Sequence, residues 1–116
     1  MQVVSGTLKL EGWQGEPGPA TVYVRLLDTS WMDAPSRTID EVVFDAVRLD
    51  EIQEHGLNFH LVAEDIDPRA RYQVSALVDL DGDGQTSVGD YLTTVAYPVL
   101  TRGFPDVVEI QARRIG

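Results

Sequence analysis

The feature that most constrains the fold of this chain is a recurring alternation of apolar and polar residues with a period of two. Such alternation places successive side chains on opposite faces of a half-buried strand. Leu57, Phe59 and Leu61, for example, alternate with Asn58 and His60. Segments with this pattern, or with many β-branched and aromatic residues, are 4–11, 21–28, 38–49, 57–63, 71–78, 91–97 and 108–113. Clusters of Gly, Pro, Asp and Ser separate them, so the sequence predicts seven strands joined by turns.

The absence of a helical pattern of ordinary length narrows the fold class further. Residues 50–56 would form at most one helical turn ending at Gly56, which is unstable without packing, so we interpret them as a connector. Seven short strands without crossover helices predict an all-β fold, an antiparallel seven-stranded β-sandwich of immunoglobulin- or transthyretin-like type. A small barrel is the alternative. The length of 116 residues predicts a single β-sandwich domain over residues 1–116.

The acidic composition limits the possible partners. Nine Lys and Arg residues against nineteen Asp and Glu residues give a net charge of −10, which would repel nucleic acid and anionic lipid headgroups. Cations and basic protein surfaces are compatible partners. We expect no direct membrane insertion, because no apolar run is long enough to span a bilayer and no signal peptide is seen. Cysteine is absent, which excludes disulfides and thiolate chemistry in this sequence.

Residues 79–90 carry the spacing of a calcium-binding EF-hand loop. Aspartates occupy loop positions one, three and five, a glycine occupies position six, and a carboxylate occupies position twelve. The predicted calcium ligands are Asp79, Asp81, Asp83, Gln85 through its backbone carbonyl, Ser87 through a water, and Asp90. Gly84 would make the sharp turn. Asp90 replaces the usual glutamate and is shorter, so we expect weak calcium binding, on the order of 10⁻⁵ to 10⁻³ M.

The charges around this loop favour a bound cation. Between Arg71 and Arg102 there is no Lys, Arg or His to neutralise its four carboxylates. The alternative is a solvated Asp/Gly hairpin turn that forms without metal. Because both flanks are strand-like, calcium would clamp the end of a β-hairpin and would not open a pair of helices.

Aromatic residues in the turns carry separate expectations. Trp13 lies in the Gly- and Pro-rich segment 12–19 and is interpreted as a lid over the end of the core. Tyr72 matches the position of a tyrosine corner, which predicts a buried ring and a hydroxyl bonded to backbone a few residues upstream. Trp31 and Met32 lie in a polar loop, where they are either folded back onto the sandwich or exposed as an anchor.

Several short segments together carry a resemblance to a known family. They are residues 6–7, 22–30, 33–35, 66–72 and 96–100. In these segments the chain resembles the YbaY/YscW family of bacterial lipoproteins, which includes the pilotins of type III secretion. The resemblance implies a small β-sandwich in the periplasm or at the outer membrane, held there by a lipid, and in the pilotin branch a role in binding a secretin. The lipobox cysteine of that family is missing here, and the family does not explain the acidic loop.

Three classes of function remain open. We favour a non-catalytic, protein-binding or chaperone-like module, because the residues assemble no nucleophile–base pair, phosphate-binding loop or histidine cluster. The family resemblance implies that this module has a pilotin-like role at the cell envelope. His55 and His60 both lack a second histidine at metal or triad spacing. A calcium-stabilised structural or adhesin-like surface module is the alternative. A calcium-dependent hydrolase, with the ion as Lewis acid and an aspartate as base, is the least favoured class.

Overall fold

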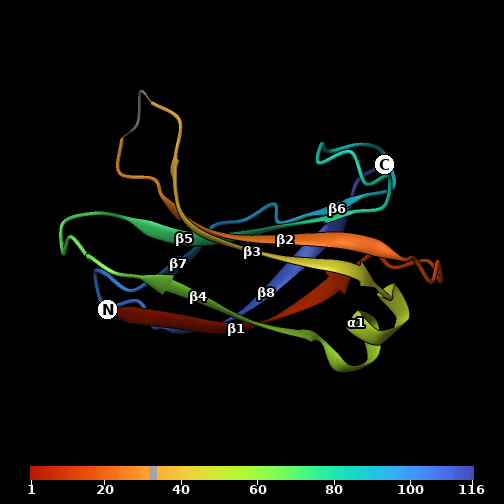
Figure 1. The fold of residues 1–116 in the computed structure, drawn as a ribbon, viewed down its shortest axis with the longest axis horizontal. Helices are drawn as coiled ribbons and strands as arrows, with labels where there is room; N and C mark the ends of the chain where they lie inside the picture. Colours follow the sequence, from red (N-terminus) through yellow and green to blue (C-terminus); the bar gives the residue numbers. More distant parts are fainter. Residues whose placement is uncertain (32–33) are drawn as a thin grey trace.

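A computed structural model describes residues 1–31 and 34–116 of the chain, which form eight strands and one short helix (Figure 1). In chain order these are β1 (Gln2–Glu11), β2 (Ala20–Asp28), β3 (Arg37–Val47), α1 (Leu49–His55), β4 (Leu57–Ala63), β5 (Tyr72–Asp79), β6 (Tyr91–Leu92), β7 (Tyr97–Val99) and β8 (Val107–Arg114). Met32, for which two placements were open, and Asp33 lie outside the described residues. Within the described part, no helix has the length and apolar character needed to cross a membrane.

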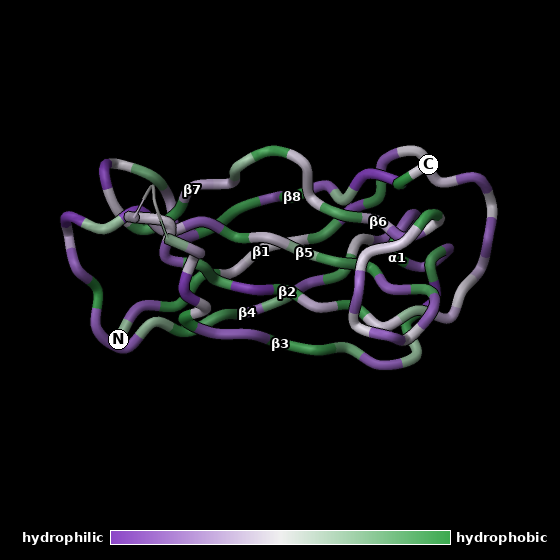
Figure 2. The backbone as a smooth tube through the Cα atoms, turned by 90° about the horizontal axis from the view of Figure 1, so that it is seen from above, coloured by the Kyte–Doolittle hydropathy of each residue, from purple (hydrophilic) through white to green (hydrophobic). Residues whose placement is uncertain are grey.

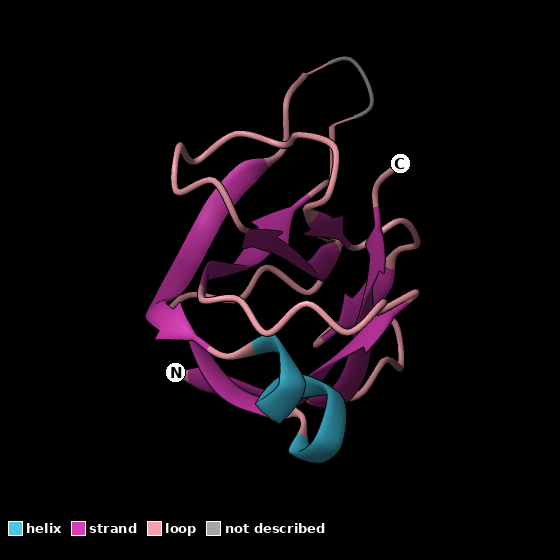
Figure 3. Ribbon diagram, turned by 90° about the vertical axis from the view of Figure 1, so that its right-hand side faces the viewer, coloured by secondary structure: helices cyan, strands magenta, loops and turns pink. Residues whose placement is uncertain are grey.

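All eight strands belong to one mixed sheet that nearly closes on itself. The strand order is β3-β2-β5-β6-β8-β1-β4, and β7 also pairs with β5. An end-on view shows the strands surrounding the interior (Figure 3). The all-β class is confirmed, whereas the antiparallel seven-stranded sandwich is corrected to a barrel-like sheet with a parallel β1–β8 pair. The correction has a physical reason, since a period of two shows which face is buried but carries no strand direction.

Side chains bridge the two places where the backbone hydrogen bonding around the barrel is interrupted. Between β3 and β4, the Asp40 carboxylate accepts the N–H of Val62 at 2.7 Å. Between β7 and β8, the Tyr97 hydroxyl accepts the N–H of Gln111 at 3.0 Å. Both contacts satisfy a strand-edge donor that has no ladder partner. Side-chain hydrogen bonds therefore complete the barrel between β3 and β4 and between β7 and β8, where backbone pairing is interrupted.

The interior is filled by the inward faces of the strands. Along β2 the predicted alternation is confirmed, with Val22, Val24 and Leu26 fully buried. Figure 2 shows green, apolar stretches along the strands, while the connections at both ends are mostly purple or white. Gly6 of β1 lies against Phe59, where an added Cβ would come within 2.4 Å of the phenyl ring. This position therefore requires glycine, because the Phe59 ring of the neighbouring strand β4 occupies the space of a side chain.

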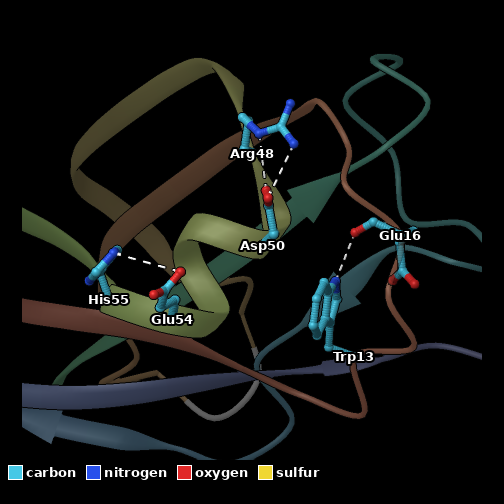
Figure 4. Close-up of polar contacts among 6 residues, drawn as sticks. All are labelled: Trp13, Glu16, Arg48, Asp50, Glu54 and His55. Atoms are coloured by element: carbon cyan, nitrogen blue, oxygen red, sulfur yellow. Dashed lines mark hydrogen bonds and ion pairs between the residues drawn. The ribbon is translucent and has the colours of Figure 1, made fainter.

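The stretch interpreted as a connector forms α1, a helix of seven residues. Leu49 and Ile52 are buried against the end of the core, and this packing stabilises a helix that would be unstable alone. Gly56, with φ of 77°, ends the helix as expected. Arg48 and Asp50 form an ion pair at 3.1 Å at its start (Figure 4).

The predicted strand 91–97 is divided into β6 and β7, both of which pair with β5. Thr93 leaves the strand and its hydroxyl accepts the N–H of Ala76 at 3.2 Å, which interrupts the regular pairing. Pro98 lies in β7, whose only strand partner among the described residues is β5. This edge position suits Pro98, because proline has no N–H to donate to a second neighbouring strand.

The predictions for Trp13 and Tyr72 are confirmed, and the structure shows which of the two predicted placements Trp31 adopts. Trp13 is half-buried against the core, and its indole N–H donates to the Glu16 carbonyl at 2.8 Å (Figure 4). The Tyr72 ring is buried and its hydroxyl accepts the N–H of Asp67 at 3.0 Å, five residues upstream. Trp31 is 54% exposed, so its side chain is not folded into the core.

Candidate functional site

The predicted calcium loop, residues 79–90, connects β5 to β6 at one end of the barrel (teal, near the C-terminus in Figure 1). Carboxylate oxygens of Asp79, Asp81 and Asp83 lie within 4.8 Å of one another. Gly84 has φ of 73°, the left-handed conformation expected of the residue that makes the sharp turn. The structure thus brings the first three predicted ligands together.

Asp79 organises the backbone of this loop from a buried position. One of its carboxylate oxygens accepts the N–H groups of Asp81 and Gly82, at 3.1 and 3.0 Å. The other accepts the N–H of Gly84 at 2.7 Å. Each carboxylate oxygen has two lone pairs, so the second oxygen retains one for a cation. Asp79 therefore holds the loop in shape and can still act as a ligand.

Ser87 and Asp90 close the loop from its other end. The buried Asp90 carboxylate accepts the N–H of Leu80 at 2.9 Å with one oxygen, and the N–H and hydroxyl of Ser87, both at 3.0 Å, with the other. The same hydroxyl contacts the Asp81 carboxylate. A hydroxyl has only one proton, so it can donate a hydrogen bond to only one of these two carboxylates at a time, and it neutralises neither. This leaves negative charge concentrated between Asp81 and Asp90.

The two other predicted positions are more exposed. The Asp83 carboxylate accepts the N–H of Gln85 at 2.9 Å, and the Gln85 side chain faces solvent. Only the backbone carbonyl of Gln85 was expected to bind metal, so an exposed side chain agrees with that role. The complete predicted set consists of oxygen donors, which are the ligands that calcium prefers and zinc does not.

Another carboxylate, Glu16 from the turn that contains Trp13, contacts Tyr91, the residue that follows the loop. The hydroxyl of the buried Tyr91 donates to the Glu16 carboxylate. Burial and this hydrogen bond raise the pKa of Tyr91. Burial raises the pKa of Glu16, but the Tyr91 hydrogen bond, local backbone N–H groups and nearby Arg114 together lower it below its ordinary value. Sequence reasoning missed this contact because its partners are 75 residues apart.

A groove of about 390 Å³ lies at the other end of β5 (left in Figure 1). Its walls come from the chain near Thr29, the start of β5, and residues 96–104. Among the described residues that line it, Arg71 and Arg102 are the charged ones, although the chain as a whole carries a net charge of −10. The lining of this groove therefore carries positive charge, opposite in sign to the net charge of the protein.

Hydrogen bonds within the fold hold the first wall of the groove in place. The N–H of Arg71 donates to the Ser30 hydroxyl at 2.9 Å, and the N–H of Thr29 donates to the Arg71 carbonyl at 2.8 Å. These bonds leave the Arg71 side chain to face the groove. Arg71 was noted in the sequence only as the boundary of the acidic stretch, because no local pattern showed that it would meet Arg102.

The second wall is a strained turn between β7 and β8. Leu100 and Arg102 have φ of 73° and 58°, a left-handed conformation that non-glycine residues rarely adopt. Thr101 between them is buried, and its hydroxyl donates to the Ala70 carbonyl at 2.7 Å. This bond ties the turn to the residue that precedes Arg71. The two arginines are thus held by connected pieces of backbone.

The family described as type III secretion system lipoprotein chaperone (YscW) matches residues 1–111. Among solved structures, an alternative pilotin from the type II secretion system of Vibrio cholerae is similar, with a TM-score of 0.79 and 26% sequence identity. The match covers 99% of this chain and 97% of that chain. No curated protein gives a match.

Proposed function

This chain belongs to the YscW family of type III secretion lipoprotein chaperones, and we propose that it acts as a non-catalytic, pilotin-like chaperone at the bacterial cell envelope. The observation that carries the proposal is the family match over residues 1–111. The similarity to a pilotin over nearly the full length of both chains supports it. A chaperone requires a binding surface and no catalytic group, which is compatible with the function class favoured from the sequence.

The proposed partner is a secretin or another envelope protein, whose placement in the outer membrane the chain would assist. The proposed location is the periplasm or the periplasmic face of the outer membrane. The groove between Arg71 and Arg102 provides this chain with a concave surface for such a partner. The similar structure belongs to a type II system and the family to type III systems, so the type of secretin is left to experiment.

The test is the fate of the secretins of the source bacterium when the gene is deleted. Secretin multimers should decrease in the outer-membrane fraction and return when the complete gene product is expressed again. Immunoblots of separated inner and outer membranes measure this. An unchanged amount and location of every secretin in the deletion strain would contradict the proposal.

A calcium ion bound to residues 79–90 is proposed to stabilise the acidic end of the barrel. The convergence of Asp79, Asp81 and Asp83 and the all-oxygen donor set support this proposal. An ion that binds only the folded loop would offset carboxylate repulsion and stabilise the protein by RT ln(1 + [L]/Kd). This amounts to about 2.7 kcal/mol at a hundredfold excess over Kd. Its role would be structural, with the ion held at a hairpin end.

Melting temperatures with EDTA and with millimolar calcium chloride test this site. Calcium should raise the melting temperature of the unmutated chain, and Asp81→Ala or Asp83→Ala should abolish the rise while leaving the fold intact. Asp45→Ala, an exposed aspartate of β3, is the matched control and should retain the rise. If calcium changes neither the melting temperature nor the NMR resonances of residues 79–90, the loop is only a turn. A calcium effect without any secretin effect would favour the structural or adhesin-like alternative.

A further inference from the structure

We infer that the groove between Arg71 and Arg102 binds an acidic peptide segment of a partner protein, with a carboxylate between the two guanidinium groups and an apolar side chain against Phe104. The inference rests on the proposed protein-binding role and deepens it by assigning the surface and the chemistry of the segment. The comparisons with the chaperone family and the pilotin assign no role to any residue of this groove.

The charges of the groove favour a carboxylate. Ion pairs among the described residues involve Lys9, Arg25, Arg48 and His55, and neither Arg71 nor Arg102 takes part in one. No carboxylate of the described residues lines the groove. Guanidinium groups bind carboxylates through paired, charge-assisted hydrogen bonds. Two guanidinium groups that line one groove, without an ion pair among the described residues, form a local site for an anion in a protein with a net charge of −10.

The apolar part of the groove favours a peptide over a small anion. Phe104 is 46% exposed at the rim, and Pro98 and the Tyr72 ring lie in the walls. Trp31, 54% exposed, follows directly after the segment that holds Arg71. Arginine and aromatic residues are the types enriched in the energetic centres of protein interfaces. A volume of about 390 Å³ accommodates two or three side chains of a segment and no folded element.

The backbone at Arg102 indicates that the groove is preformed. Left-handed φ values at Leu100 and Arg102 cost free energy, and such strain persists where the surroundings impose it, commonly at binding sites. The Thr101 hydrogen bond to Ala70 imposes it here. One nitrogen of the Arg102 guanidinium donates to the Arg69 carbonyl at 3.3 Å, which fixes the side chain and leaves its other N–H groups available.

The experiment uses a phage library of random twelve-residue peptides selected on the full chain. Enriched peptides should contain Asp or Glu next to a Leu, Phe or Trp. Their affinities, measured by fluorescence anisotropy, should fall at least about tenfold with Arg71→Gln plus Arg102→Gln. Arg113→Gln, an exposed arginine of β8 at the other end of the barrel, is the matched control and should change affinity little. Melting temperatures confirm that all variants fold.

Each outcome of the peptide experiment tests the inference directly and does not depend on whether the chain assists a secretin. A lack of enrichment, enriched peptides without acidic residues, or unchanged affinity of the double variant would overturn it. Complete displacement of the peptides by millimolar succinate would show that the groove takes small dicarboxylates, and would also overturn it. No secretin is used in the peptide experiment, so its result is independent of the deletion strain. Peptide binding can fail while the deletion strain loses its secretin multimers, and peptides can bind while the multimers are unchanged.

Discussion

The acidic loop and the arginine-lined groove occupy opposite ends of the same strand. Tyr72, the first residue of β5, lines the groove, and Asp79, its last residue, begins the loop. The loop is one contiguous segment with a fixed ligand spacing, whereas the groove joins three segments that are distant in sequence. A site contained in one segment is therefore visible in a sequence, while a site assembled by the fold is not.

The two ends also differ in how they are held. The loop depends on buried carboxylates that accept its own N–H groups, and the groove depends on hydrogen bonds between separate segments. The eight residues of β5 span roughly 23 Å, and sites at this separation usually respond independently to mutation. We therefore expect changes at one end to leave the properties of the other unaltered.

The largest effect is expected for Asp79→Ala at the acidic end. The substitution removes the acceptor of three backbone N–H groups in a buried setting and should lower the free energy of unfolding by about 2 to 4 kcal/mol. Urea unfolding in EDTA measures this without calcium. Asp83→Ala, whose side chain is exposed, is the control and should change the free energy by less than about 0.5 kcal/mol. Similar losses for both variants would mean that Asp79 does not organise the loop.

A smaller effect is expected for Tyr72→Phe at the groove end. The N–H of Asp67 loses its acceptor, which should cost about 1 to 2 kcal/mol. The urea midpoint should fall, while the rise of melting temperature with calcium should be retained because the loop is not touched. Tyr23→Phe, on the half-exposed outer face of β2, is the matched control. An unchanged midpoint for Tyr72→Phe would contradict a stabilising role of this bond.

The sequence predicts local features of this fold well. Alternation identifies most strands and their buried faces, and the position of Tyr72 after a Pro-containing turn predicts its hydrogen bond. The spacing of residues 79–90 predicts the convergence of Asp79, Asp81 and Asp83, which are three of its four predicted carboxylate ligands. These features depend on residues that are close in the chain, where periodicity and turn chemistry act directly.

Features that depend on distant contacts were not predictable. The parallel pairing of β1 with β8 brings Gly6 opposite Val108, and no local pattern encodes that direction. Packing of Leu49 and Ile52 makes a helix from residues that would be disordered alone. The groove requires the strained turn at Arg102 to meet the start of β5, a contact made by the fold as a whole.

The smallest effect is expected for Glu16→Gln, as a change with pH in its melting temperature relative to the unmutated chain. This variant tests whether the electrostatics of the acidic end are independent of the groove end. The pKa of Glu16 is lowered from its ordinary value of about 4.5 in the folded state, so the unfolded state binds more protons between the two values. Its contribution is therefore present above about pH 4.5 and is lost as the pH falls through the folded pKa. In EDTA, the melting temperature of Glu16→Gln should lie below that of the unmutated chain at pH 6, and the gap should narrow at pH 3.5.

Two further variants locate this effect at the acidic end. Tyr91 has a raised pKa and stays neutral over this range, so within the hydrogen-bonded pair only Glu16 titrates. Tyr91→Phe removes the hydrogen bond that lowers the pKa of Glu16, and should diminish the additional pH dependence that Glu16 contributes. Glu64→Gln, at an exposed carboxylate between β4 and β5 near the groove end, removes one charge of the same sign and is the matched control. A gap for Glu16→Gln that does not change with pH would mean that Glu16 acts by shape alone, because only the charged carboxylate makes a contribution that protonation removes.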